Sequence, residues 1–197
     1  MRWIWVRHGE TEQNRLRQYL GQADPPLNSK GEEQARNLAD RLSQWPITAV
    51  YTSDLQRCIQ TAAAIANGRG LEPVACSALR ELSFGLWEGK TYAQIMEEDD
   101  ERAVMWYADP FTVSPPDGET LFAFGERVDR LLAGIKEACR PDDTILLVSH
   151  GGVIRWFQSK WIHGDSGCFW EVQAISHGEA LLASWDGSRW VKESTSL

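Results

Sequence analysis

Two of the four histidines in this sequence share one setting, in which an apolar run comes just before the histidine and a glycine just after it. His8 follows the run at residues 3–6 and Arg7, and His150 follows the run at residues 144–148 and Ser149. Short apolar runs of this kind are typical of buried strands in a parallel sheet. Ligands of open α/β sheets bind at the carboxyl ends of the strands. The two imidazoles are therefore candidate members of one site.

The residues around these histidines indicate that the ligand is an anion. Arg7 precedes His8, and Arg57 lies in the first turn of an expected helix. A guanidinium keeps its charge at any working pH, and its planar fork matches two phosphate oxygens. A helix that opens after Gly151 would also direct free amides at an anion. Together these features predict a phosphate site.

A zinc site is the other chemistry that two histidines suggest. The sequence has no His-x-x-x-His pair, and none of its four cysteines, Cys58, Cys76, Cys139 and Cys168, forms a Cys-x-x-Cys pair. An arginine beside a ligand would also repel the metal. We therefore expect no metal and no cofactor. A single histidine after a strand is more often structural, and it is the repeated setting that favours a site.

The elements that must position these residues alternate along the chain. Short β-branched or aromatic runs alternate with helical patterns, which predicts a three-layer α/β/α sandwich with a mostly parallel sheet. Strands are expected at residues 3–6, 48–51 and 144–148, and two closing strands near residues 170–175 and 180–185.

Polar residues mark where the expected helices begin. Ser29, with Glu32 three residues on, and Ser53, with Gln56, both have the spacing of a capping box. Asp117 is expected to cap a long helix. The helix after His150 should run through residue 161.

Composition limits the class of protein. The 197 residues are 43% hydrophobic and 24% charged, which suits one soluble domain over residues 1–197. The net charge of -8 argues against a nucleic-acid partner. No apolar stretch approaches the ~20 residues that cross a bilayer, so we expect a cytoplasmic protein with reduced thiols. No feature of the sequence indicates an oligomeric state.

The motifs also resemble a known family. The similarity runs through Arg7-His8-Gly9-Glu10-Thr11 with Asn14, Asp24-Pro25-Pro26-Leu27, Ser53-Asp54-Leu55-Gln56-Arg57, Arg80-Glu81-Leu82 with Phe84-Gly85 and Trp87-Glu88-Gly89, and Ser149-His150-Gly151-Gly152. These blocks arrive in the order found in the histidine phosphatase superfamily, which includes the cofactor-dependent phosphoglycerate mutases. The resemblance covers residues 2–160 and implies a phosphoglycerate mutase-like fold.

The same resemblance implies a role for each matching residue. His8 matches the nucleophile that becomes phosphohistidine, and Glu81 matches the proton donor. The residues that would hold the phosphoryl oxygens are Arg7, Arg57, His150 and Asn14. Gly21, Gln22 and Gly151 fall where family members touch substrate.

This chemistry sets requirements on protonation. Phosphoryl transfer spreads charge over the equatorial oxygens, so catalysis consists mostly of positioning and electrostatics. Arg7, Arg57 and a protonated His150 would supply the positive charge without a metal. His8 must be neutral to attack, and Glu81 must hold a proton for the leaving group although its reference pKa is about 4.3.

The residues after Glu81 favour a phosphatase over a mutase. Mutases of this family carry a tryptophan followed by two arginines, whereas Trp106 is followed by Tyr107 and Ala108. The acidic run at residues 97–101 is also a poor setting for a doubly phosphorylated cofactor. A mutase and a non-catalytic scaffold that binds phosphorylated ligands remain alternatives.

The expected partner is a small phosphorylated metabolite. Residues 106–107 and 115–120 are similar to family members that act on α-ribazole 5'-phosphate in cobalamin assembly, which is our first expectation. A phosphoserine phosphatase and a broad-specificity enzyme are alternatives. Residues 84–117 are expected to form an irregular lid that sets specificity.

Two expectations concern residues outside the motifs. Trp87, Trp106, Tyr107 and Phe111 would form either an aromatic wall over the substrate or part of the core. His163 and His177 are expected to be ordinary surface or loop residues.

Overall fold

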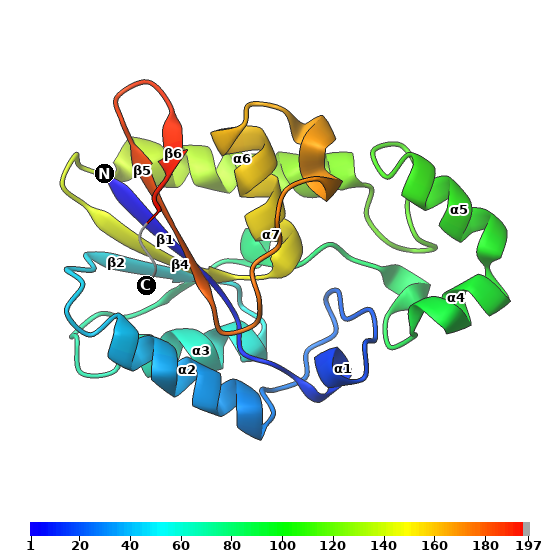
Figure 1. Ribbon diagram of the computed structural model, residues 1–197, viewed down its shortest axis with the longest axis horizontal. Coiled ribbons are helices and arrows are strands. Elements are labelled where there is room, and N and C mark those ends of the chain that lie inside the picture. Colours follow the sequence, from blue (N-terminus) through cyan, green and yellow to red (C-terminus); the bar gives the residue numbers. More distant parts are fainter. Residues whose placement is uncertain (195–197) are drawn as a thin grey trace.

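A six-stranded mixed sheet runs through the computed structural model, which describes residues 1–194 (Figure 1). Its strands lie in the order β3 (Val74–Ala75), β2 (Ala49–Thr52), β4 (Thr144–Ser149), β1 (Arg2–Arg7), β5 (Ala180–Trp185) and β6 (Trp190–Lys192). The first four are parallel to one another, and β5 and β6 are antiparallel to their neighbours. The expectation of a mostly parallel sheet is confirmed.

Helices cover both faces of this sheet. On one face, α2 (Ser29–Arg41) and α3 (Gln56–Ala66) pack against Ile4 and Val6 of β1. On the other, α6 (Leu121–Ala138) and α7 (Gly151–Trp156) pack against Trp3 and Trp5. All four of these β1 residues are fully buried, because a strand covered on both faces needs an apolar residue at every position. The three-layer α/β/α sandwich is confirmed.

The remaining elements are short helices, and four of those described lie between α3 and α6 in the sequence. They are α1 (Glu12–Arg15), α4 (Tyr92–Glu98), α5 (Asp100–Ala108), the 3-10 helices Ser77–Leu79, Gly85–Trp87 and Ser166–Trp170, and a π-helix at Phe157–Ile162 that continues α7. The segment expected to be irregular at residues 84–117 thus contains α4 and α5. Figure 1 shows these two helices projecting at one end of the molecule, away from the sheet. No helix within residues 1–194 is long and apolar enough to cross a membrane.

Two helices are capped by a different residue from the one expected, although α2 does begin at Ser29. Asn28, not Ser29, caps α2, and its side chain accepts a hydrogen bond from the amide of Gly31. Thr120, not Asp117, caps α6. In each case the residue just before the first helical turn is in the extended conformation that lets a side-chain oxygen reach the free amides.

The first expected closing strand is wrong. Residues 166–170 form a 3-10 helix, and residues 171–179 form no strand, whereas β5 and β6 close the sheet. The strand β5 pairs with β1 on one side and β6 on the other, so the sheet offers no free edge beside it for a further strand.

Candidate active site

The two motif histidines leave neighbouring strands at the same edge of the sheet. Strands β1 and β4 are parallel, with Arg7 in register with Ser149, and the amide of His8 donates to the carbonyl of Ser149 at 3.0 Å. The rings of His8 and His150 consequently lie with centroids 5.1 Å apart. The expectation that they meet in space is confirmed by this pairing.

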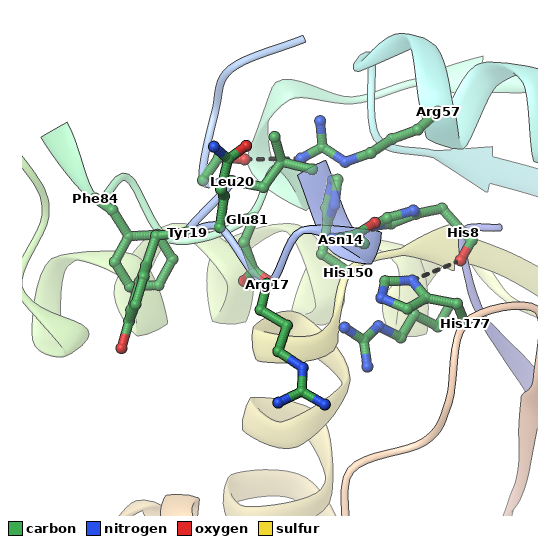
Figure 2. Close-up of a pocket in the computed structure, with 13 residues that line it drawn as sticks. His8, Asn14, Arg17, Tyr19, Leu20, Arg57, Glu81, Phe84, His150 and His177 are labelled. Carbon is green, nitrogen blue, oxygen red and sulfur yellow. Dashed lines mark hydrogen bonds between the residues drawn. The ribbon is translucent and has the colours of Figure 1, made fainter. Parts of the chain in front are cut away.

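A cavity of about 300 Å³ opens over these two rings (Figure 2). It is lined by Arg7, His8, Asn14, Arg17, Gln18, Tyr19, Leu20, Gly21, Arg57, Glu81, Phe84, His150 and His177. Most of the residues expected at the site from the sequence therefore surround one space, although they come from distant parts of the chain. Its volume is at the lower end of the range for small-molecule pockets.

Gln22 and Gly151 are not among the lining residues. The amide of Gln22 donates to Glu88 at 2.8 Å, and its side-chain amide reaches Glu119 at 3.4 Å. Gly151 lies behind Arg7: a Cβ at Gly151 would lie 3.3 Å from the guanidinium carbon. Both residues therefore support the wall of the cavity.

The ring of His8 is oriented for attack by its other nitrogen. Its Nδ1 donates to the carbonyl oxygen of Gly9 at 2.7 Å, which leaves the lone pair on Nε2. Burial and the positive charge of Arg57 hold the pKa of His8 well below its usual range. The nucleophile candidate is therefore neutral at physiological pH.

The ring of His150 is held by residues that the sequence did not point to. Its Nε2 lies 2.9 Å from Oγ of Ser53 and 3.4 Å from Sγ of Cys58. Ser53 thus contacts the site instead of forming the expected capping box. The N-cap of α3 is Leu55, whose side chain makes no capping hydrogen bond. Burial and Arg57 also lower the pKa of His150 well below its usual range, so His150 is neutral until an anion enters.

Beside the two rings, the positive charge of the cavity comes from Arg7 and Arg57. Arg57 donates to the carbonyls of Ala23 and Gly21, both at 2.7 Å, and Arg7 donates to the carbonyl of Ile175 at 2.8 Å. The Nε atoms of both arginines are buried without a partner in the described structure. Because buried donors are normally paired, these two atoms fit a site that receives an anion.

Asn14 presents a donor to the same space. Its Oδ1 accepts hydrogen bonds from the amide and the hydroxyl of Thr11, at 3.1 and 3.0 Å. The oxygen is therefore committed to Thr11, which leaves the amide N–H groups of Asn14 for the cavity.

Glu81 lies between its own loop and the start of α7. Its carboxylate accepts from the amide of Leu82 at 3.0 Å and from the amide of Gly152 at 2.9 Å. A Cβ at position 152 would lie 2.2 Å from Oε1 of Glu81, so only glycine allows this approach. Arg127, paired with Glu119 at 2.8 Å, also donates to the carbonyl of Glu81 at 2.8 Å and fixes the loop.

The rim of the cavity was not identified from the sequence. Tyr19 and Phe84 form an edge-to-face pair with centroids 5.0 Å apart, on the side of the cavity opposite His8 and His177 (Figure 2). Arg17 also lines the rim and has a left-handed backbone with φ of 57°. Within residues 1–194 its guanidinium has no hydrogen-bond or ion-pair partner.

The aromatic residues proposed as a wall belong elsewhere. Trp87 and Trp106 are 2% and 1% exposed and lie in the core, and Phe111 packs against that core. Tyr107 is 39% exposed and contacts the cavity only through Tyr19, whose hydroxyl it meets. Burial of these large apolar rings stabilises the core.

His177 lies in a turn, as expected, but it also lines the cavity and is therefore not an ordinary surface or loop residue. Its ring centroid lies 5.0 Å from that of His8. The glycine after His177 is not a signal, because all four histidines in the sequence are followed by a glycine. His177 precedes a strand, and only the antiparallel direction of β5 brings it to the edge where β1 ends.

The described residues offer no cluster that would hold a metal. No group of three His, Cys, Asp or Glu side chains within residues 1–194 has a suitable arrangement. Metal independence remains a prediction for chelation experiments.

Comparison with known proteins relates this chain to one family and to several phosphatases. Residues 3–196 match the family model described as histidine phosphatase superfamily (branch 1). The adenosylcobalamin/alpha-ribazole phosphatase of Escherichia coli K12 is 35% identical over 86% of this chain and 84% of its own length. Phosphoserine phosphatase 1 of Hydrogenobacter thermophilus is 32% identical over 85% and 79%. The crystal structure of the alpha-ribazole phosphatase from Shigella flexneri superposes with a TM-score of 0.90, at 31% identity over 98% and 95% of the two chains.

Proposed function

This chain is a phosphatase that belongs to the histidine phosphatase superfamily, and we propose that it hydrolyses phosphomonoesters through a phosphohistidine at His8 with Glu81 as the general acid. The observation that carries the proposal is the convergence on a single cavity of five motif side chains: the imidazoles of His8 and His150, the guanidiniums of Arg7 and Arg57, and the carboxylate of Glu81. Each group has a matching task in phosphoryl transfer.

The first half of the reaction forms the phosphoenzyme. Nε2 of neutral His8 attacks phosphorus, and the bond from phosphorus to the ester oxygen breaks. Arg7 and Arg57 neutralise the charge on the equatorial oxygens, and the N–H groups of Asn14 donate to one of them. The leaving alkoxide takes its proton from Glu81.

The second half restores the enzyme. Glu81, now a carboxylate, removes a proton from water as that water attacks the phosphorus of phosphohistidine. The bond from nitrogen to phosphorus breaks, phosphate leaves, and Glu81 again holds the proton. No step requires a metal, so we expect EDTA to leave activity intact and vanadate to inhibit it. Loss of activity after chelation, restored by magnesium, would contradict this mechanism.

Two other functions are separated from this one by simple assays. A scaffold that only binds phosphorylated ligands would not hydrolyse p-nitrophenyl phosphate. A mutase would convert 3-phosphoglycerate to 2-phosphoglycerate, in the presence of bisphosphoglycerate, faster than it releases phosphate. The buried position of Trp106, followed by Tyr107 and Ala108, supplies no second anion site and favours hydrolysis.

For the substrate we propose α-ribazole 5'-phosphate. Two of the relatives are named for alpha-ribazole, and the rim of this chain suits a leaving group that carries a planar ring. Tyr19 and Phe84 present aromatic surface beside the phosphate site, and a planar ring gains more from such a surface than a small aliphatic group does. Arg17 beside them can stack on the same ring.

Phosphoserine is the second candidate, because one relative is named for it and because Arg17 could pair with a carboxylate. The discriminating experiment ranks kcat/KM for α-ribazole phosphate, phosphoserine and 3-phosphoglycerate in the wild type and in two variants. Phe84→Leu should impair α-ribazole phosphate selectively, whereas Arg17→Gln should impair phosphoserine if its carboxylate is bound. Similar kcat/KM for all substrates would favour a broad-specificity enzyme. A cytoplasmic location, one domain and a lid at residues 84–117 remain predictions.

A further inference from the structure

We propose that His177 is a further phosphate-binding residue, which takes up a proton when the phosphoryl dianion enters and donates Nε2–H to it. The proposal rests on the proposed function, since it assumes that the cavity receives a phosphoryl group. It adds a group to the site that the sequence motifs do not point to.

The first support is the position of the ring. His177 lines the same cavity as His8, on the side away from Tyr19 and Phe84 (Figure 2). Its centroid lies 5.0 Å from that of His8, about as far as the centroid of His150 at 5.1 Å. The nucleophile is thus flanked by two imidazoles, and a phosphoryl group in the cavity above His8 lies near both.

The second support is the use of the ring nitrogens. Nδ1 of His177 lies 3.2 Å from the carbonyl oxygen of His8, which can only accept. Nδ1 must therefore carry hydrogen, and in the neutral ring the lone pair is on Nε2. A proton added at Nε2 turns that atom into a donor without disturbing the bond to His8.

The third support is the rigidity of the corner that carries the ring. The amide of Gly178 contacts the carbonyls of Arg7 and His8 at 3.2 and 3.3 Å. Gly178 has φ of +70°, and a Cβ there would lie 2.5 Å from Gln34 of α2. The corner is therefore fixed against the end of β1, so that the ring is positioned before a ligand arrives.

The charges around His177 explain why protonation follows the ligand. Burial lowers the pKa of His177 to about 4, and Arg7 of β1 and Arg57 of α3 contribute to this shift because they repel a proton. Glu10 attracts one, but Glu10 is paired with Lys30 at 2.9 Å.

The other ionisable groups near this corner do not reverse that balance. His8 beneath the ring is itself neutral. Glu179, two residues along the corner, is paired with Arg41 of α2 at 3.1 Å. A bound dianion cancels the field of the two arginines. An anion within ~4–6 Å raises the pKa of a histidine by about 1–3 units, which moves the pKa of His177 toward neutral pH.

Sulfate is a suitable probe, because it is a tetrahedral dianion that does not titrate between pH 5.5 and 8. Calorimetric titrations in two buffers of different ionisation enthalpy give both the affinity and the number of protons taken up by the protein. His177→Asn keeps a donor where Nδ1 lies and removes Nε2. His163→Asn changes an exposed histidine outside the cavity and serves as the matched control.

In the wild type and in His163→Asn, we expect sulfate to bind more tightly at pH 5.5 than at pH 8, with proton uptake. In His177→Asn, affinity at pH 5.5 should fall about 10-fold, as expected for one hydrogen bond to a charged group, and proton uptake should decrease. His177→Gln offers a permanent amide donor near the place of Nε2, and should keep much of the affinity with a weaker pH dependence.

Equal affinity and equal proton uptake in the wild type and in His177→Asn would overturn the proposal, and would leave His177 as a brace for the His8 carbonyl. The result is independent of turnover. A protein that binds sulfate as described but forms no phosphohistidine would contradict the proposed function and leave this inference standing.

Discussion

The base and the rim of the cavity are built in different ways. At the base, His8, Arg57 and His150 are 3%, 1% and 1% exposed, and each is held by at least one hydrogen bond. At the rim, Arg17 is exposed and has no partner in the described part of the chain, and Tyr19 and Phe84 lie on loops. The base belongs to the ends of β1 and β4 and to the first turn of α3, whereas the rim does not.

This difference separates chemistry from selectivity. Groups at the base cannot move without disturbing the sheet or α3, so they impose one reaction on every substrate. Loop residues at the rim can change without such a cost, and loops carry much of the functional variation in proteins. Substitutions at the base should therefore affect all phosphomonoesters alike, whereas those at the rim should depend on the leaving group.

The largest effect is expected for the nucleophile. His8→Ala should lower kcat by at least about 10³-fold for every substrate, because the covalent intermediate cannot form. Trapping with radiolabelled substrate should give an acid-labile label in the wild type and none in the variant. Retention of a few per cent of both activity and label would exclude His8 as the nucleophile.

A smaller effect that depends on the leaving group is expected for the acid. Glu81→Gln should lower kcat/KM by about 10²–10⁴-fold for alkyl phosphates, and by less for p-nitrophenyl phosphate, whose leaving group needs no proton. Gly152→Ala should produce the same pattern more weakly, because the added Cβ displaces the carboxylate of Glu81. Equal losses on both substrates would assign Glu81 another role.

Rim variants should give effects of up to about tenfold, in line with the contribution of an aromatic contact. Phe84→Leu and Tyr19→Leu should raise KM for α-ribazole phosphate and leave p-nitrophenyl phosphate nearly unchanged. Steady-state kinetics on both substrates give the ratio of their KM values in each variant. A uniform loss of kcat would show that the rim supports the base, and would remove the distinction drawn here.

The smallest expected effect is on the stability of the fold. The pH dependence of stability distinguishes the base, which contains the histidines, from the rim. His8, His150 and His177 all have lowered pKa values in the folded protein. The unfolded chain, with histidine pKa values of about 6.5, therefore binds more protons in the interval below that pH. Stability should fall as the pH decreases from about 6.5 toward 4, and sulfate should oppose this loss.

Thermal unfolding at pH 7.5, 6.0 and 5.0, with and without sulfate, measures that effect. His177→Asn should shift the melting temperature less between pH 7.5 and 5.0 than the wild type does, and Phe84→Leu should not alter that difference. A flat profile from pH 6.5 to 5.0 in the wild type would contradict the burial of three neutral imidazoles.

Local signals in the sequence predicted much of the fold but misplaced several details. The apolar runs at residues 3–6 and 144–148 identified β1 and β4. A strand that is buried on both faces is apolar at every position, so its own sequence is enough to recognise it. Capping was less predictable: Ser53 has the spacing of a cap but bonds to His150 instead. A serine hydroxyl can bond either to the local backbone or to a distant side chain. The choice depends on which side chains the fold brings close, and a local sequence pattern does not show this.

The site divides in the same way. Motif residues such as His8, Arg57 and Glu81 were identified by type, spacing and family resemblance, because phosphoryl transfer restricts which side chains can serve. Tyr19 and Phe84 were not identified as lining residues, because the sequence alone does not distinguish an aromatic residue of a cavity from one of the core. Trp87 and Trp106 are core residues.

The sequence by itself determined the kind of chemistry, because strand, histidine and glycine recur in a local order that needs no knowledge of distant contacts. Tertiary structure alone decided which further residues share the cavity. His177 reaches it because β5 runs antiparallel to β1, so that the start of one strand lies beside the end of the other. Strand direction is set by pairing between segments far apart in the chain, and no local pattern around His177 encodes it.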